Sequence, residues 1–188
     1  HIVKYEAMMG TGYFPGGEEQ AYSLDDRDAG SYLIGTAEVS VCSYHYDELL
    51  SADELPKRYA GYSPCYRREA GTYGKDTRGL YRIHQFYKVE QVVICRADDE
   101  ESDKLHAELL NNAEEMIQML KLPYRVVDVC SGDMGLGQVY KNDIEVWMPS
   151  RNGYGETHSC SSFHEFQARR LNLRYKDSNG RNSYCYTL

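Results

Sequence analysis

Apolar and polar positions alternate over a long central part of the chain, and this alternation predicts strands. Residues of Leu80–Cys95 switch between two faces, as a half-buried strand does. Tyr59–Ala70 predicts an antiparallel partner, and Gly71, Gly74 and Gly79 favour a sharply turning loop between the two. The stretch is therefore predicted to be a β-hairpin with a long tip.

Several shorter strands are predicted elsewhere, with Tyr46–Arg58 as a short helical or irregular connection. Asn179-Gly180 is a turn sequence that joins the last two strands. The predicted strands are Tyr32–Ser43, Tyr124–Val129, Asp143–Met148, Leu171–Tyr175 and Ser183–Leu188.

One long helix is predicted over Asp99–Leu120, with Asp99 or Ser102 as its cap and Pro123 beyond its end. Strands joined mainly by hairpins, together with one helix, indicate an α+β fold with a mostly antiparallel sheet flanked by helices. The apolar stripe of the helix comprises Leu105, Leu109, Ala113, Met116, Ile117 and Leu120.

Charge is distributed unevenly along the chain. The net charge is −8, yet the part from Lys57 to Lys88 carries eight basic residues against only Glu69 and Asp76. A local cationic region in an acidic protein predicts a polyanionic ligand, and arginine suits phosphate through its planar fork of donors.

Other kinds of protein are disfavoured by what the sequence lacks. No apolar run approaches the roughly 20 residues that span a bilayer. The six cysteines form no C-x-x-C pair, and no G-x-S-x-G, H-E-x-x-H or Walker loop is present. A metal-dependent hydrolase built on Glu38, Glu90 and Glu156 would lack a pair of histidine ligands.

The stretch from Pro64 to Glu90, PCYRREAGTYGKDTRGLYRIHQFYKVE, resembles motif 2 of class II aminoacyl-tRNA synthetases. It is similar above all to motif 2 of bacterial-type seryl-tRNA synthetases. Further segments match that family in order, so the resemblance covers essentially the whole chain. They are GTGYFP (Gly10–Pro15), GTAEV (Gly35–Val39), LPYRVV (Leu122–Val127), SGDMG (Ser131–Gly135), DIEVWMPS (Asp143–Ser150) and FQARR (Phe166–Arg170).

The resemblance implies the class II catalytic fold and a reaction in which serine and ATP give seryl-adenylate, followed by transfer to tRNA(Ser). Arg67 is the implied catalytic residue, which contacts the α-phosphate and the serine carboxylate. Glu69 would face the adenine amino group, and Phe86 would stack on the base. The implied ATP-binding residues are Arg67, Arg68, Glu69, Ile83, Phe86, Glu156, Thr157, His158 and Ser159.

Two further sites follow from the resemblance. Glu156 and Ser159 would hold Mg²⁺, for which hard oxygen ligands are suited. The implied serine-binding residues are Thr36, Ala37, Glu38, Arg67 and Glu90. Lys75 and Arg78, in the hairpin tip, would meet ATP and later the acceptor end of the tRNA.

The resemblance also implies that residues 1–188 are part of one catalytic domain, with the motif 2 region at 59–95. Motif 1, motif 3 and the N-terminal coiled-coil arm of the family have no counterpart, so we expect a fragment with weak or no activity by itself. The full-length protein is expected to be a cytoplasmic homodimer that does not bind membranes.

Two other functions remain open from the sequence. A synthetase-like paralogue would activate a small amino acid for a carrier protein instead of tRNA, and a non-catalytic relative would keep only the binding module. Synthetases for threonine, proline and glycine share the basic hairpin, whereas GTAEV and FQARR favour serine.

Overall fold

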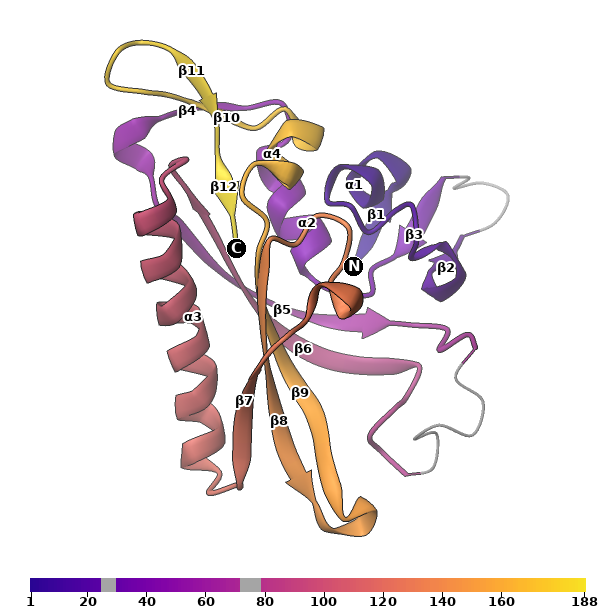
Figure 1. Ribbon diagram of the computed structural model, residues 1–188. Helices are drawn as coiled ribbons and strands as arrows, with labels where there is room; N and C mark the ends of the chain where they lie inside the picture. Colours follow the sequence, from indigo (N-terminus) through magenta and orange to yellow (C-terminus); the bar gives the residue numbers. More distant parts are fainter. Residues whose placement is uncertain (25–29, 72–78) are drawn as a thin grey trace.

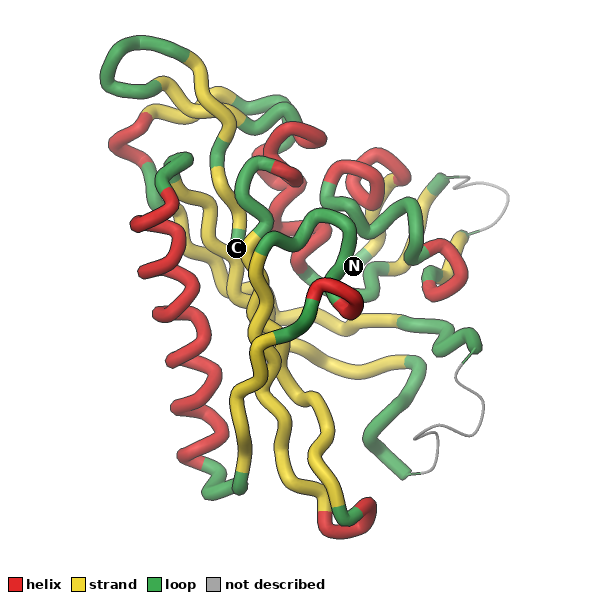
Figure 2. The backbone as a smooth tube through the Cα atoms, in the orientation of Figure 1, coloured by secondary structure: helices red, strands yellow, loops and turns green. Residues whose placement is uncertain are grey.

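A computed structural model describes residues 1–24, 30–71 and 79–188 of the chain. Two long antiparallel ribbons cross near the middle of the molecule, and the helix α3 runs along one side of them. Three shorter helices and a small sheet lie on the other side (Figures 1 and 2). The strands and helices are β1 (Ile2–Lys4), α1 (Tyr5–Gly10), β2 (Tyr22–Ser23), β3 (Ser31–Leu33), α2 (Glu38–Cys42), β4 (Leu49–Ser51), β5 (Lys57–Tyr66), β6 (Gln85–Cys95), α3 (Asp99–Met119), β7 (Tyr124–Asp128), β8 (Tyr140–Met148), β9 (Gly153–Ser162), α4 (Phe166–Leu171), β10 (Arg174–Lys176), β11 (Asn182–Tyr184) and β12 (Tyr186–Thr187).

The strands of the described chain form four three-stranded sheets, in the orders β1-β3-β2, β11-β10-β4, β12-β6-β5 and β7-β8-β9. All of these pairs are antiparallel except β10 with β4. The predicted α+β fold with a mostly antiparallel sheet is therefore confirmed. The predicted turn at Asn179-Gly180 joins β10 to β11, which pair as expected.

The β5–β6 hairpin has two different faces, because side chains alternate along each strand. Gly61, opposite Glu90, lies on the face that α2 covers, and a side chain there would meet Val41 and Ala37. The back face packs against α3, where the guanidinium of Arg58 binds the Glu108 carboxylate. Helix α2 on one face and helix α3 on the other thus hold one end of the hairpin, while the other end extends towards the candidate site.

Helix α3 confirms the long predicted helix but corrects its cap and its buried stripe. Asp98, rather than Asp99 or Ser102, is the N-cap, and its carboxylate accepts a hydrogen bond from the Glu101 amide at 2.8 Å. Met116 and Leu120 are exposed, whereas Ser102 and His106 are buried on the sheet side. Polar side chains of the neighbouring strand explain this: the His106 ring hydrogen-bonds the Asn142 amide oxygen at 2.9 Å.

Loss of the cap gives a stability prediction. Asp98→Ala is expected to lower the free energy of unfolding by about 1 kcal/mol, because the Glu101 amide loses its partner and a charge leaves the helix N-terminus. Urea unfolding of the chain measures this. Asp99→Ala is the matched control, and an equal loss in that variant would mean that the cap contributes nothing specific.

Several strand predictions were incomplete: β6 begins at Gln85, the predicted strand Ser183–Leu188 is divided into β11 and β12, and β4 lies in the predicted connection. Two further corrections concern the site. The expected strand Tyr32–Ser43 ends at Leu33, and helix α2 occupies Glu38–Cys42. The strand β9 was not predicted at all. Both corrections affect candidate site residues, since α2 carries Glu38 and β9 carries Glu156 and Ser159.

Candidate active site

Arg67 lies just beyond the end of β5, and three contacts fix it. Its backbone amide donates to the His84 carbonyl at 2.9 Å, which continues the hairpin pairing. Its Nε donates to the Gly35 carbonyl at 3.2 Å, and its guanidinium carbon lies 5.3 Å from the centre of the Phe86 ring. The structure therefore brings Arg67 and Phe86 together, as predicted. Part of the guanidinium fork remains for a ligand.

Glu69 does not share a strand face with Arg67, as the predicted strand Tyr59–Ala70 would require, so that prediction was wrong for this residue. β5 ends at Tyr66, and Glu69 has a left-handed backbone with φ of 51°. Its carboxylate accepts a hydrogen bond from Arg82 at 2.7 Å. A turn, rather than the pleat of a strand, therefore sets the direction of this side chain.

Two polar side chains of the predicted serine pocket, Thr36 and Glu90, form a hydrogen-bonded chain with Lys88. The Thr36 hydroxyl donates to the Glu90 carboxylate at 2.7 Å and accepts from Lys88 Nζ at 2.8 Å. Lys88 also forms an ion pair with Glu90. Lys88 was not among the predicted site residues, although it shares the strand face of Glu90. It offsets part of the negative charge of the pocket.

Glu38 joins this group from the first turn of α2. Burial and the nearby Glu90 carboxylate raise the pKa of Glu38 to about 7, while the Gln167 hydrogen bond opposes the rise. Lys88 and Arg67 also lower the pKa, so both lie within electrostatic reach of Glu38. Ala37 is buried and packs on the hairpin at Gly61, so it contributes to the pocket by packing and not through a polar group.

The raised pKa of Glu38 predicts a stability profile. Between about pH 4.5 and 7 the folded chain holds a proton on Glu38 that the unfolded chain has released. The contribution of this group to stability is therefore lost as pH rises through that window, by at most about 1.4 kcal/mol per pH unit. Urea unfolding at several pH values should show a more negative slope for the wild-type chain than for Glu38→Gln.

Glu108→Gln provides a control for that measurement. Arg58 holds the pKa of Glu108 below its usual value, so its contribution is lost as pH falls. Its replacement should therefore leave the slope between pH 4.5 and 7 unchanged, and should change the slope in the opposite sense only below about pH 4.5. Equal slopes in the wild-type chain and Glu38→Gln would contradict the raised pKa.

A β-bulge brings Glu156 and Ser159 to the same face of the sheet. Residues three apart on a regular strand point to opposite faces. Here Glu156 lies opposite Glu145 and His158 opposite Ile144, so Thr157 is an extra residue. Ser159 consequently lies opposite Asp143, on the face of Glu156.

Asp143 extends this acidic corner. The residue is 7% exposed and forms an ion pair with Lys141 at 3.2 Å through one oxygen. The other oxygen, Oδ1, is buried and has no hydrogen-bond partner among the described residues. Partial burial and then Asp143 raise the pKa of Glu156, whereas Lys141 and Arg67 lower it.

The acidic corner and the hairpin end face a common space. Arg67 influences the pKa of both Glu38 and Glu156, which lie on different elements. Tyr81, which precedes β6 in the chain, donates its hydroxyl hydrogen to the Glu156 carbonyl at 2.7 Å. Arg67, Phe86 and Glu156 therefore belong to one region rather than to separate surfaces.

The donors at the corner suit Mg²⁺. A carboxylate and a hydroxyl on one face, beside a buried carboxylate oxygen that lacks a partner, make an all-oxygen set. No group of three His, Cys, Asp or Glu side chains that could hold a metal occurs in the part of the chain that the structure describes.

The remaining predicted ATP-binding residues are placed as follows. Thr157 turns its hydroxyl to the Ile144 carbonyl at 3.2 Å, and His158 lies on the opposite face from Glu156. Arg68 is exposed, and Ile83 is half-buried just before β6. A contribution of His158 or Ile83 to nucleotide binding would therefore come mainly through the backbone.

The cationic region of the sequence is not one surface in the structure. Lys57 and Arg58 form ion pairs with Glu54 and Glu108 at the α3 end of the hairpin, far along β5 from Arg67. Lys75 and Arg78 lie outside the described residues. The predicted polyanionic ligand therefore stays a prediction, and it concerns the end of the hairpin near Arg67 instead of the paired Lys57 and Arg58.

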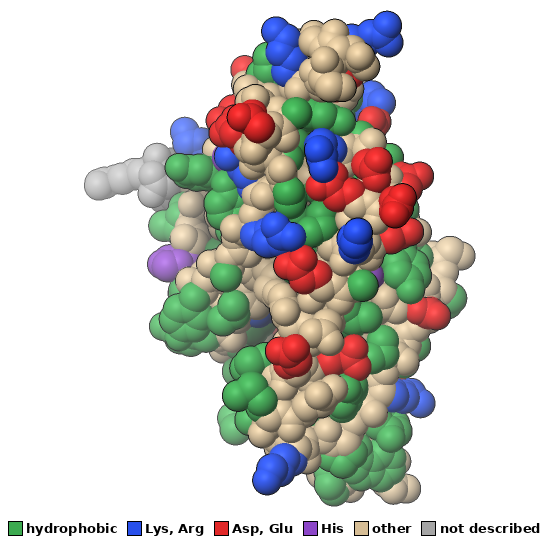
Figure 3. Space-filling view, turned by 90° about the vertical axis from the view of Figure 1, so that its left-hand side faces the viewer, with side chains coloured by type: hydrophobic (Ala, Val, Ile, Leu, Met, Phe, Trp, Pro, Cys, Tyr) green, Lys and Arg blue, Asp and Glu red, His purple; other side chains and the backbone are tan. Residues whose placement is uncertain are grey.

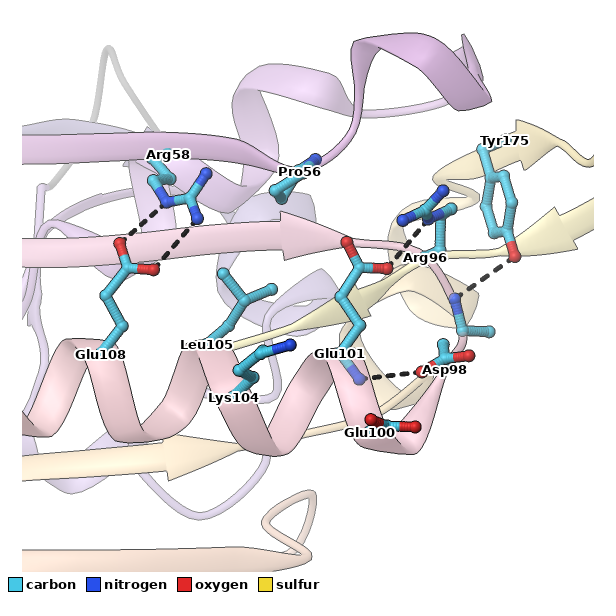
Figure 4. A pocket seen from close by; sticks show the side chains of 11 residues that line it. Pro56, Arg58, Arg96, Asp98, Glu100, Glu101, Lys104, Leu105, Glu108 and Tyr175 are labelled. Atoms are coloured by element: carbon cyan, nitrogen blue, oxygen red, sulfur yellow. Dashed lines mark hydrogen bonds and ion pairs between the residues drawn. The ribbon is translucent and has the colours of Figure 1, made fainter.

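A cavity of about 740 Å³ lies away from this site, between the start of α3 and the back of the hairpin (Figure 4). Its arginines are already engaged, since Arg58 binds Glu108 and Arg96 binds Glu101. The cavity is lined by Pro56, Arg58, Arg96, Ala97, Asp98, Glu100, Glu101, Lys104, Leu105, Glu108 and Tyr175.

Comparison with known proteins agrees with the geometry. Residues 22–188 match the family model described as tRNA synthetase class II core domain (G, H, P, S and T). The chain belongs to this family. The class II catalytic fold implied by the sequence is thereby confirmed.

Individual members resemble the chain closely. Serine–tRNA ligases of Deinococcus radiodurans and Kosmotoga olearia are 52% and 49% identical over the whole chain, which spans 44% and 43% of their lengths. A crystal structure of seryl-tRNA synthetase from Pyrococcus horikoshii complexed with ATP superimposes with a TM-score of 0.92 at 44% identity, over 99% of this chain and 41% of that one. The chain thus spans less than half the length of these relatives.

None of the helices in the described chain, including the 21 residues of α3, combines the length and apolarity needed to cross a membrane.

Proposed function

We propose that the chain forms the adenylate-forming part of a serine–tRNA ligase, which activates serine with ATP and transfers the seryl group to tRNA(Ser). The observation that carries this proposal is the position of Arg67. It is fixed on Phe86 and Gly35, between the Glu38–Glu90 pocket and the Glu156–Ser159 corner. Relatives with serine–tRNA ligase activity in their names support the choice of substrate.

In the proposed reaction, a serine carboxylate oxygen attacks the α-phosphorus of ATP, and pyrophosphate leaves with the electrons of the broken P–O bond. The side chains position the reactants and stabilise charge, and none acts as a nucleophile. Arg67 would bridge the serine carboxylate and the α-phosphate. Phe86 would stack on adenine, and the Glu69 carboxylate would accept a hydrogen bond from the adenine amino group.

The amino-acid end of the proposed substrate would lie in the pocket of Thr36, Glu38 and Glu90. Two carboxylates suit the α-ammonium group, and the Thr36–Glu90–Lys88 chain offers partners for the serine hydroxyl. A pocket that hydrogen-bonds a hydroxyl group rejects analogues without one, because its own polar groups would be left unpaired.

Mg²⁺ would be held by Glu156 and Ser159, with Asp143 behind them. When bound, the ion neutralises phosphate charge in the transition state. The acceptor tRNA would approach from the hairpin side. Helix α3 carries seven acidic residues and one lysine, and acidic side chains gather on the face that it lines (Figure 3), which disfavours a polyanion there. A homodimer in the cytoplasm is part of the same proposal.

A chimera tests the proposal. Residues 1–188 would replace the matching 44% of the Deinococcus radiodurans enzyme, to which they are 52% identical. We expect serine-dependent ATP–pyrophosphate exchange, with threonine, alanine and glycine much poorer, and charging of total tRNA. Exchange without tRNA charging would favour the paralogue that loads a carrier protein, and binding without exchange would favour a non-catalytic module.

A further inference from the structure

Gln167 of helix α4 is buried and joins four segments that are distant in the sequence. It is 1% exposed, although glutamine is mostly a surface residue. Its Nε2 donates to the Thr11 carbonyl at 3.0 Å and to Glu38 Oε1 at 2.5 Å. Its Oε1 accepts from the Thr187 hydroxyl at 2.6 Å. Its amide group is therefore paired at both ends.

These partners permit one orientation of the amide. The Thr11 carbonyl and the Glu38 carboxylate are acceptors, so they require the NH₂ end. The Thr187 hydroxyl can donate or accept, so it fits the oxygen end once the two acceptors have fixed the NH₂ end. A reversed amide would place its oxygen against two acceptors and leave buried groups unpaired, which is costly. Thr11 and Thr187 thus hold the Gln167 donor towards Glu38.

The other charged neighbours of Glu38 act on its carboxylate in opposite directions: Glu90 disfavours the ionised form, whereas Lys88 and Arg67 favour it. Glu90 lies close enough to destabilise a second negative charge, while Lys88 is shared with Glu90 and Thr36. Arg67 lies within electrostatic reach from the hairpin, and the Cys42 thiol of α2 donates to Gln167 Oε1 at 3.7 Å. Gln167 supplies a short hydrogen bond from α4 to one carboxylate oxygen and leaves the other for a ligand.

We propose that Gln167 is a positioning residue for amino-acid recognition: it fixes the Glu38 carboxylate in the pocket, and the Thr187 hydroxyl fixes Gln167. The inference rests on the proposed function, in which Glu38 binds the substrate ammonium group. Thr187 lies in β12, which pairs with β6 at Ile94, and among the described residues its hydroxyl is linked to the pocket by its hydrogen bond to Gln167. A change at Thr187 should therefore alter serine recognition without any direct contact.

The test uses the chain itself, two ligands and one spectroscopic measurement. Calorimetry gives the Kd of ATP and of a seryl-sulfamoyl-adenosine analogue for the wild-type chain, Thr187→Val and Thr187→Ser. We expect Thr187→Val to weaken the seryl analogue about tenfold, the range of a hydrogen bond to a charged group, and ATP less than twofold. Thr187→Ser keeps the hydroxyl and should restore binding of the analogue.

Two further measurements distinguish the positioning role of Thr187 and Gln167 from a general effect on the stability of the fold. Ser102→Ala removes another buried hydroxyl, under α3, and should leave the ratio of the two Kd values unchanged. Carbon-13 NMR of the Glu38 carboxyl should show a higher pKa in Thr187→Val than in the wild-type chain, because the bond that favours the charged form is weaker. Gln167→Met should show the same upward change if Thr187→Val does not fold.

Three outcomes would overturn the positioning role: an equal loss for both ligands, the same selective loss in Ser102→Ala, or an unchanged Glu38 titration. Failure of the proposed function looks different. A wild-type chain that binds ATP but not the seryl analogue would refute serine recognition, while the Glu38 titration would still decide whether Gln167 controls that carboxylate.

Discussion

Replacing Arg67 with alanine is expected to lower serine-dependent ATP–pyrophosphate exchange in the chimera by about a thousandfold, because a preorganised donor at the developing charge is lost. Arg67 approaches the reacting phosphate from a fixed position, with Nε on the Gly35 carbonyl and the guanidinium over Phe86. The fold is expected to remain intact, since Arg67 is half-buried and lies beyond the end of β5. Single-turnover formation of the adenylate measures the effect directly.

Two variants make this test specific. Arg67→Lys should recover little activity, because an ammonium group cannot bridge two oxygens as a planar guanidinium does. Arg58→Ala is the matched control on the same hairpin, since Arg58 binds Glu108 on the back face. It should leave the exchange rate within about twofold of wild type. A loss below tenfold for Arg67→Ala, or an equal loss for Arg58→Ala, would refute the assigned role.

Local patterns predicted the parts of the fold that local forces determine. The alternation of Leu80–Cys95 predicted β6 because one side of each strand is buried, and the periodicity of Asp99–Leu120 predicted α3. The resemblance to motif 2 placed Arg67 and Phe86 together correctly. It could do so because the hairpin pairing brings residues 67 and 86 to the same end of two adjacent strands.

Features set by tertiary contacts were missed. A strand was predicted over Tyr32–Ser43, but helix α2 occupies its second half, where Val41 packs against the hairpin at Gly61. The bulge at Thr157 could not be predicted either, because the three-residue spacing of Glu156 and Ser159 is the same in a regular strand and in a bulged one. Sequence reasoning assigned no role to Gln167 within FQARR, because its partners Thr11 and Thr187 are distant in the sequence and come next to it only in the folded chain.

Replacing Glu156 with glutamine is expected to lower the exchange rate roughly a hundredfold and to raise the Mg²⁺ concentration needed for half-maximal rate, because a charged oxygen ligand becomes a neutral one. The bulge at Thr157 places this carboxylate beside Ser159 and opposite Glu145. Ser159→Ala should show the same change in Mg²⁺ dependence with a smaller loss of rate, since a hydroxyl group is the weaker ligand.

Glu145→Gln is the matched control for this charge change. Glu145 lies on the same sheet face as Glu156, but its carboxylate is bound by Arg125 at 2.6 Å. Its replacement removes one negative charge from the same region and should leave the Mg²⁺ dependence unchanged. If both variants shift the Mg²⁺ requirement equally, the effect arises from the general negative potential of the sheet and not from ligation by Glu156. A hundredfold loss for Glu156→Gln with unchanged Mg²⁺ dependence would instead assign that carboxylate to substrate positioning, and the magnesium site would have to be sought around Asp143.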